Sequence, residues 1–205
     1  MTISISTQAG AASETVHGGV FVAVVGPSGA GKDTIIDYAR RSLAEDHLFH
    51  FVRRVITRPS NADAEDHDTM NEADFAKAKL AGAFAHHWSA HGLSYGLPQS
   101  VQDEVGKGSV AIANVSRGIL PELKRSYSHC TIVHITASFD VLARRLAMRG
   151  RENADEIKRR LMRAAPNACD PDDAIMINNS ASVEEAGARF VAILKQSAKQ
   201  PAAMV

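Results

Sequence analysis

Gly26-Pro27-Ser28-Gly29-Ala30-Gly31-Lys32-Asp33 is the stretch that decides the fold of this chain. It follows the apolar run of residues 20–25, which predicts a buried strand, and it precedes residues 34–39, whose pattern predicts a helix. Glycines let the backbone turn tightly enough for successive N–H groups to point at one anion, and the following helix adds its positive N-terminal end. The order of strand, glycine-rich loop and helix therefore predicts a loop that binds nucleotide phosphates.

The last two residues of this loop carry its charges. Lys32 supplies a positive point charge for the phosphates. The usual pattern has Ser or Thr at the next position, where the hydroxyl holds Mg²⁺, whereas this chain has the carboxylate of Asp33. Because Mg²⁺ accepts either kind of oxygen, the change predicts an altered metal site and not a lost one. An ordinary glycine turn is the alternative, which the joint placement of glycines, lysine and flanking elements disfavours.

The composition predicts a globular protein of the cytoplasm. Of 205 residues, 45% are hydrophobic and 22% are charged, which is ordinary for a globular protein. Because 23 Lys and Arg balance 23 Asp and Glu, the net charge of the chain does not favour binding to nucleic acid or to an anionic membrane. Cys130 and Cys169 lack the spacing of a metal or redox motif, which fits a reducing compartment. No apolar stretch approaches the roughly 20 residues of a membrane span, and the N-terminus lacks the pattern of a secretion signal.

The remaining pattern predicts one α/β domain. Residues 1–17 are small, polar and aperiodic and are expected to form a disordered tail, which leaves residues 18–205 as a single domain. Further apolar runs alternate with helical patterns and predict a parallel sheet covered on both faces, in three layers; these runs are residues 49–56, 109–115, 131–136 and 174–178. Ligands of such sheets gather beyond the C-terminal ends of the strands.

Two segments that do not belong to the predicted sheet or its covering helices are candidates for binding substrate. Residues 58–100 contain short strands, turns and a helix capped at Asn71, and are expected to form an insertion over the sheet edge. Residues 141–165 contain two amphipathic helical faces and seven arginines, which are 144, 145, 149, 151, 159, 160 and 163. A solvated helix surface is the alternative for the second segment. Beside a phosphate loop, however, the arginines favour a lid that stabilises charge during phosphoryl transfer.

Three histidines in the first of these segments raise the question of a metal site. His87 and His91 are four residues apart, and His86 is adjacent. This stretch is predicted to be strand and turn, where that spacing gives no shared face, so substrate contact or a polar surface is favoured over zinc. The acidic loop of residues 63–68 is open to a solvated or a cation-binding role.

The motifs in their order resemble the guanylate kinase group of nucleoside monophosphate kinases over about residues 19–195. They are the loop at 26–33, Thr57-Arg58-Pro59, Tyr95-Gly96, Leu142-x-x-Arg145-Leu146-x-x-Arg149-Gly150-x-Glu152, and Arg160-Leu161. The resemblance implies a guanylate kinase-like P-loop fold with an acceptor-binding insertion and a helical lid. It also implies ATP as the nucleotide.

This chain differs from guanylate kinases at several positions that bind the phosphate acceptor in that group. Guanylate kinases read guanine with a serine, a tyrosine and acidic strand residues, where this chain has Arg54, His67, Ala113 and Val115. Without those partners a buried guanine edge would lose about 1 to 3 kcal/mol per polar group. An acceptor other than GMP is therefore expected, and the extra arginine suggests an extra phosphate.

Within the superfamily, these departures resemble the ribose 1,5-bisphosphate phosphokinases of phosphonate catabolism. The supporting segments are Gly31-Lys32-Asp33, Asn114-Val115-Ser116-Arg117, Trp88 to Pro98 and Arg149-Gly150-Arg151-Glu152. The resemblance implies transfer of the γ-phosphoryl group of ATP to the 1-phosphate of ribose 1,5-bisphosphate, which gives 5-phosphoribosyl 1-diphosphate and ADP. The alternatives are a guanylate or other nucleoside monophosphate kinase and a non-catalytic guanylate-kinase-like interaction module. A homodimer is compatible with the sequence, which does not fix the oligomeric state.

The resemblance also implies a role for each site residue. Residues 26–34 would bind ATP, with Lys32 on its phosphates, Asp33 on Mg²⁺ and Asn178 on the adenine. The lid arginines that act on the transferred group would be Arg145, Arg149, Arg151 and Arg160. The sugar phosphate would be held by Arg54, Arg58, His67, Tyr95, Asn114, Ser116 and Arg117.

Overall fold

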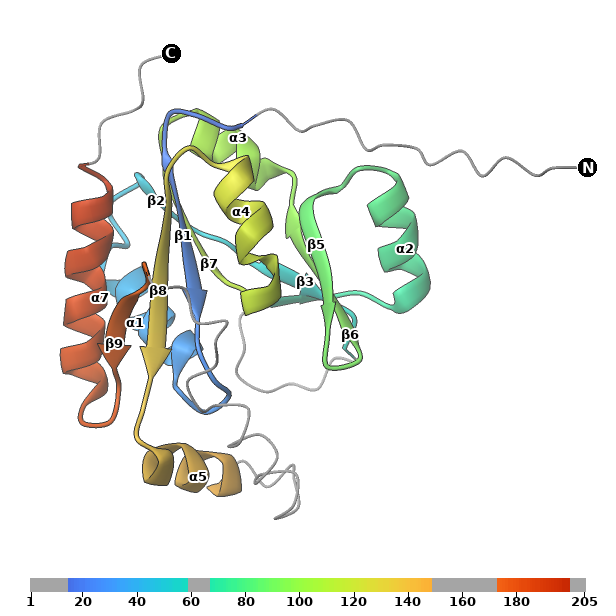
Figure 1. Cartoon of the computed structure of the whole chain (residues 1–205). Helices are drawn as coiled ribbons and strands as arrows, with labels where there is room; N and C mark the ends of the chain where they lie inside the picture. The colour runs from blue at the N-terminus through green and yellow to red at the C-terminus, as the bar shows by residue number, and fades with distance from the viewer. Residues whose placement is uncertain (1–14, 59–66, 149–172, 200–205) are drawn as a thin grey trace, which may run out of the picture.

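Five parallel strands form the central layer of the computed structural model, which describes residues 15–58, 67–148 and 173–199 (Figure 1). From edge to edge the strands are β2 (Phe49–Phe51), β7 (Val110–Asn114), β1 (Val20–Val25), β8 (Cys130–Thr136) and β9 (Ile175–Asn178). β1 lies in the middle, paired in parallel with β7 on one side and β8 on the other. The loop that follows β1 therefore leaves the sheet between two strand ends, which is where such sheets bind ligands.

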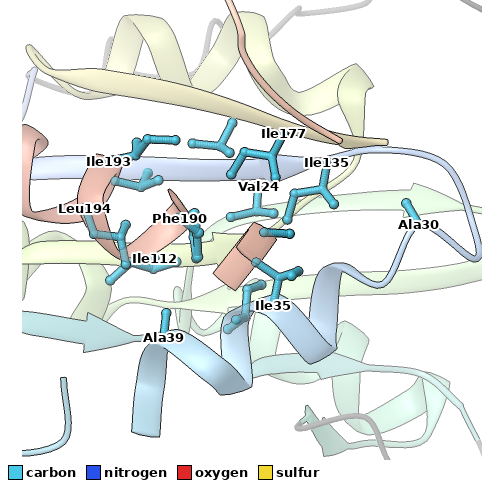
Figure 2. Packing of buried hydrophobic residues seen from close by; sticks show 14 of the residues in the cluster. Val24, Ala30, Ile35, Ala39, Ile112, Ile135, Ile177, Phe190, Ile193 and Leu194 are labelled. Atoms are coloured by element: carbon cyan, nitrogen blue, oxygen red, sulfur yellow. The ribbon is translucent and has the colours of Figure 1, made fainter. Parts of the chain in front are cut away.

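Helices cover both faces of this sheet and confirm the predicted three layers. On one face lie α1 (Lys32–Ser42) and α7 (Val183–Ser197), and on the other lie α3 (Ser100–Gly106) and α4 (Leu120–Ser126). Alternate residues of β1 enter the two cores: Val24 packs with the α1 and α7 side, and Ala23 with the α3 and α4 side. Figure 2 shows the first core, where Phe190 of α7 lies among the aliphatic side chains of the strands.

A second, four-stranded sheet lies beside α4, next to α2 (Figure 1). Its order is β4 (His67–Thr69), β3 (Arg54–Ile56), β6 (Leu93–Pro98) and β5 (Phe84–Ala90), and α2 spans Glu72–Leu80. β5 and β6 form an antiparallel hairpin across the turn at residues 91–92. The predicted cap of α2 is confirmed, because Asn71 Oδ1 accepts a hydrogen bond from the backbone N–H of Asp74 at 2.8 Å.

Two strand predictions are wrong in detail. Residues 49–56 were expected as one strand, but the chain leaves the central sheet after Val52, whose N–H still bonds Ile112, and enters the second sheet at Arg54. Both halves bury apolar residues, so their composition does not show the break. The run 174–178 was expected to be buried, yet β9 is an edge strand in which Ile175 and Met176 are 38% and 46% exposed.

The structure describes parts of the two segments that were predicted to bind substrate. The second sheet begins at Arg54, four residues before the predicted insertion of 58–100. Of the predicted lid, α5 (Phe139–Met148) is described, with Leu142 and Leu146 buried, while residues 149–165 lie outside the described residues. A short 3₁₀ helix, η1 (Arg117–Ile119), leads from β7 into α4.

Two further findings concern the ends and surface of the chain. Residues 15–17 of the predicted tail are described, and the N–H of Val16 bonds the Ser126 carbonyl at 2.7 Å.

In the ranges that the structure covers, no helix has both the length and the apolar character needed to cross a membrane.

The contact between α1 and α7 gives a test of this packing. A Cβ added at Gly187 of α7 would overlap the ring of Tyr38 of α1. We expect Gly187→Ala to lower the free energy of unfolding by about 1–3 kcal/mol, because the collision outweighs the higher helix propensity of alanine. Urea unfolding measures the change. Gly118→Ala is the control, since a Cβ there meets nothing within 4 Å, and an equal loss in both variants would contradict the prediction.

Candidate functional site

The glycine-rich loop between β1 and α1, residues 26–33, is fixed by close contacts with the sheet. Gly26 has a φ of 146°, and a Cβ there would collide with the carbonyl oxygen of Ile135 on β8. Gly31 caps α1 with a φ of 85°, and a Cβ there would lie 2.5 Å from Asn179 Nδ2. Residues that carry a side chain rarely adopt these positive φ values, and their Cβ atoms would not fit here. Both positions therefore require glycine. The loop then enters α1 with its N–H groups at the helix N-terminus, the arrangement that binds phosphate.

Lys32 lies against this loop. Its Nζ atom donates hydrogen bonds to the carbonyl oxygens of Gly26 and Pro27, at 2.9 and 3.0 Å. The ammonium group is thus positioned by backbone atoms of the loop that the sequence predicts to surround the nucleotide phosphates. A phosphate oxygen bound there would meet a positive charge that is already in place.

Asp33 connects the loop to the second sheet. Its Oδ1 atom accepts a hydrogen bond from Asn114 Nδ2 at 2.7 Å and lies 3.7 Å from Nη2 of Arg54. Asn114 ends β7 and Arg54 begins β3, so one carboxylate contacts residues from both sheets. The side chain of Arg54 is 11% exposed and that of Asp33 is 31% exposed. At 3.7 Å the ion pair is too long for a hydrogen bond, so guanidinium donors of Arg54 can serve an entering anion.

A small pocket that is open to solvent lies beside this junction. Its walls come from α1, β7 and the connection between the two sheets, and they consist of Asp33, Ile36, Asp37, Arg40, Val52, Arg54, Ile112 and Asn114. Arg40 and Asp37 neutralise each other across 2.8 Å. The pocket therefore places a buried arginine within reach of a ligand that also lies next to the phosphate loop.

Arg145 of α5 holds the same loop from another side. Its guanidinium donates to the carbonyl oxygen of Asn179 at 3.0 Å and to those of Gly29 and Ala30 at 3.4 Å. Burial, and to a lesser extent the neighbouring charge of Arg144, lowers the pKa of Arg145. Arginine nevertheless stays protonated in proteins, so the group remains a cation beside the loop.

Asn179 lies beside the loop and follows a predicted strand, where ligands are expected, but the sequence assigned it no role. It is 1% exposed, its Nδ2 atom donates to the Ala30 carbonyl at 2.8 Å, and its backbone N–H donates to Thr136 at 2.7 Å. Its Oδ1 atom has no hydrogen-bond partner in the part of the chain that is described. Asn178 was predicted instead, but its Oδ1 atom accepts from Ser180. The only signal in the sequence was a second polar residue after the strand run.

The predicted acceptor residues fall into two groups. Ser116 Oγ accepts a hydrogen bond from Trp88 Nε1 at 2.8 Å, and Tyr95 stacks on the same tryptophan with ring centroids 5.4 Å apart. Arg117 Nη2 lies 3.3 Å from Nε2 of His134, a residue of β8 beneath Gly26. These contacts place Ser116 and Tyr95 together on the hairpin side, and Arg117 close to the phosphate loop.

Three other predicted residues lie on or next to described elements. His67 pairs with Arg54 in the sheet register, Arg58 follows β3, and Thr34 is exposed on α1. Arg149, Arg151 and Arg160 lie outside the described residues, so their roles stay predictions. Within the described ranges, no group of three or more His, Cys, Asp or Glu side chains is arranged to hold a metal ion.

Comparisons with known proteins give matches over most of the chain. The AAA domain family matches residues 22–164. A relative from Brucella melitensis biotype 2, named ribose 1,5-bisphosphate phosphokinase PhnN, is 54% identical over 165 residues, which are 80% of this chain and 86% of that protein. A protein of the same name from Agrobacterium fabrum is 46% identical over 177 residues, 86% of this chain and 97% of its own.

Among solved structures, the fold is similar to that of guanylate kinase from Anaplasma phagocytophilum. The TM-score is 0.64 at 18% identity, and the match covers 91% of this chain and 89% of that one. At this identity the similarity concerns the fold alone. It confirms the guanylate kinase-like architecture that the sequence motifs predicted.

Asn179 offers a test of how the loop is held. We expect Asn179→Ala to weaken ATP binding about tenfold, because the Ala30 carbonyl loses its shorter hydrogen bond, keeps only the 3.4 Å contact with Arg145, and the loop is held less firmly. Isothermal titration of the purified chain with ATP measures the affinity.

Asn179→Asp is the matched variant for this test. It keeps the size of the side chain but removes the donor, and should weaken ATP binding as well. Unchanged affinity in both variants would show that Asn179 does not position the loop.

Proposed function

Because this chain belongs to the ribose 1,5-bisphosphate phosphokinase family, we propose that it transfers the γ-phosphoryl group of ATP to the 1-phosphate of ribose 1,5-bisphosphate. The products are 5-phosphoribosyl 1-diphosphate and ADP. The observation that carries the proposal is the position of Arg54, buried beside Asp33 where the pocket meets the phosphate loop. A buried cation in that position suits an acceptor with phosphate groups better than one with a neutral base.

The chemistry requires positioning more than proton transfer. The nucleophile is an oxygen of the 1-phosphate, which is ionised at neutral pH, so no general base is needed. It forms a bond to the γ-phosphorus while the bond from that phosphorus to the bridging oxygen breaks, and ADP leaves with the electron pair. Since both reactants are polyanions, the protein has to hold them in line and neutralise their charge.

The residues around the loop are suited to that task. Backbone N–H groups of residues 26–31 and the ammonium of Lys32 would bind the β- and γ-phosphates, and Arg145 would reach them from α5. Arg149, Arg151 and Arg160 would complete a lid of residues 141–165, and Asn178 would lie near the adenine. We assign residues 18–205 to one kinase domain, with residues 58–100 as the acceptor-binding part.

Asp33 is the residue that would hold Mg²⁺, together with phosphate oxygens of the nucleotide. A carboxylate is a ligand that Mg²⁺ prefers, and Asp33 has a second oxygen besides the one that accepts from Asn114. Bound there, Mg²⁺ would neutralise charge that develops on the phosphates.

The acceptor would be held from both sheets. Arg54, Arg58 and Arg117 supply positive charge for its phosphates. His67, Tyr95, Asn114 and Ser116 supply hydrogen-bonding groups. Ala113 and Val115, at the positions where guanylate kinases read guanine with acids, are buried and apolar, which disfavours GMP.

The thiol of Cys130 is consistent with the cytoplasmic location that we propose for this kinase. It is a free cysteine, as expected in a reducing compartment. Burial raises its pKa to about 12, so it has little thiolate character and no evident part in the reaction.

Direct assay of the acceptor tests the proposed function. With ATP and Mg²⁺, we expect the chain to convert ribose 1,5-bisphosphate to 5-phosphoribosyl 1-diphosphate, detected by mass, and to turn over GMP far more slowly. Lys32→Ala should lower turnover by about 10²- to 10³-fold without unfolding, because it removes a charge that stabilises the transferred group. Turnover of GMP at a higher kcat/KM would instead identify a nucleoside monophosphate kinase, and tight ATP binding without turnover of any acceptor would identify a non-catalytic module.

Arg54 provides a separate test of the acceptor site. We expect Arg54→Ser to raise the KM for ribose 1,5-bisphosphate at least about tenfold while changing the ATP affinity little, because it removes a charge-assisted contact to the acceptor alone. Arg53→Ser is the matched control, since the neighbouring side chain is 55% exposed and pairs with Asp68. An unchanged acceptor KM would remove Arg54 from the proposed binding site.

A further inference from the structure

The histidine at position 86 connects the second sheet to the core of the protein. It lies on β5, is 3% exposed, and has a partner on each ring nitrogen. Nδ1 is 2.7 Å from Glu122 Oε1, and Nε2 is 3.2 Å from the hydroxyl of Tyr127. Glu122 belongs to α4 and Tyr127 follows that helix, so both partners belong to the three-layer core. A side chain of the acceptor-binding sheet is thus bonded twice across the boundary between the two sheets.

The chemistry of the three groups fixes which of them donates. The carboxylate of Glu122 only accepts, so Nδ1 of His86 carries a hydrogen and donates it. Burial raises the pKa of Tyr127, whose hydroxyl therefore keeps its proton and can donate to Nε2. The Tyr127 ring is itself fixed by stacking on Phe21 of β1, with centroids 4.7 Å apart. The Tyr127 hydroxyl is thus held by core packing, while the second bond goes to the Glu122 side chain, which is 45% exposed.

The next inward-facing residue of the same strand makes a second bond across this boundary. Residues two apart on a strand face the same side, and Trp88 donates from Nε1 to Ser116 Oγ at 2.8 Å. Trp88 also stacks on Tyr95, its partner on β6, with the rings 6° from parallel. Ser116 directly precedes η1, which leads into α4. His86 and Trp88 therefore attach one hairpin to one segment of the core, residues 116–127.

We propose that His86 is a positioning residue for the acceptor. Through Glu122 and Tyr127 it fixes the β5–β6 hairpin on the core, and this sets the distance of Tyr95 from the pocket beside Asp33 and from Ser116. The inference rests on the proposed function, because Tyr95 and Ser116 are assigned to acceptor binding there. His86 itself does not contact the substrate, since its ring is buried and both nitrogens are bonded.

Variants of His86 and its partner distinguish this role from a merely structural one. We expect His86→Ala and Glu122→Ala each to raise the KM for ribose 1,5-bisphosphate about tenfold, with ATP affinity changed less than about twofold, because misplacement of binding groups weakens only the substrate they hold. The double variant should be no worse than His86→Ala alone, since Glu122→Ala removes a bond that His86→Ala already removes. His86→Gln keeps a donor and an acceptor and should recover most of the loss.

A readout independent of the substrate uses the single tryptophan of the chain, Trp88. Because it lies in the hairpin, its fluorescence reports the placement of the hairpin directly. We expect acrylamide quenching of Trp88 to increase about twofold in His86→Ala under native conditions, since the hairpin opens locally while the core stays folded. His87→Ala is the matched control, because the neighbouring side chain is exposed and faces the other side of β5, and it should change neither quenching nor KM.

The two readouts separate the failure of this inference from that of the proposed function. If wild type does not use ribose 1,5-bisphosphate but His86→Ala exposes Trp88, the proposed function is wrong and the fixing of the hairpin stands. Unchanged quenching in His86→Ala, or equal losses of acceptor and ATP affinity, would overturn the inference. So would a lower melting temperature with unchanged quenching and KM, which would make His86 an ordinary core residue.

Discussion

The site depends on how tightly the phosphate loop is held against the ends of two strands. Gly26 lies so close to the carbonyl of Ile135 that no other residue fits, and the amide of Asn179 fixes Ala30 on the other side of the loop. A loop that presents several N–H groups to one anion has to be preorganised, because backbone freedom lost on binding would reduce affinity. Lys32 and Arg145 are positioned by this same backbone, so the charges of the site follow from the loop conformation.

The second sheet brings the proposed acceptor site to the loop. It has its own hydrogen-bond ladder, and it meets the core through side chains, among them Arg54 with Asp33, His86 with Glu122, and Trp88 with Ser116. Such contacts can fix an angle between two sheets, and they can also reform after a small movement. Phosphoryl transfer between two polyanions benefits from both properties, because the reactants have to be held in line and shielded from water.

The sequence predicted the parts of this protein that depend on local pattern. Alternation of apolar runs and helices gave the three layers, and the loop at 26–33 gave the site, because each signal lies within a few neighbouring residues. The break between β2 and β3 was missed because both strands bury apolar side chains. Asn179 was missed because its partner, Ala30, is 149 residues away in the chain. His86 was predicted to contact substrate or to lie on a polar surface, since the sequence could not show that Glu122 faces it.

Two residues that differ from the usual motifs, and that are far apart in the sequence, lie next to each other in the structure. Asp33 replaces the Ser or Thr of the usual phosphate loop, and Arg54 replaces the serine with which guanylate kinases bind guanine. The structure places them 3.7 Å apart. A buried arginine without a counter-charge would be strongly destabilising, and a carboxylate at the phosphate loop would repel the nucleotide unless a cation accompanied it. The carboxylate of Asp33 therefore offsets part of the charge of Arg54 before substrates bind, while at Asp33 the cation that would accompany the nucleotide is Mg²⁺.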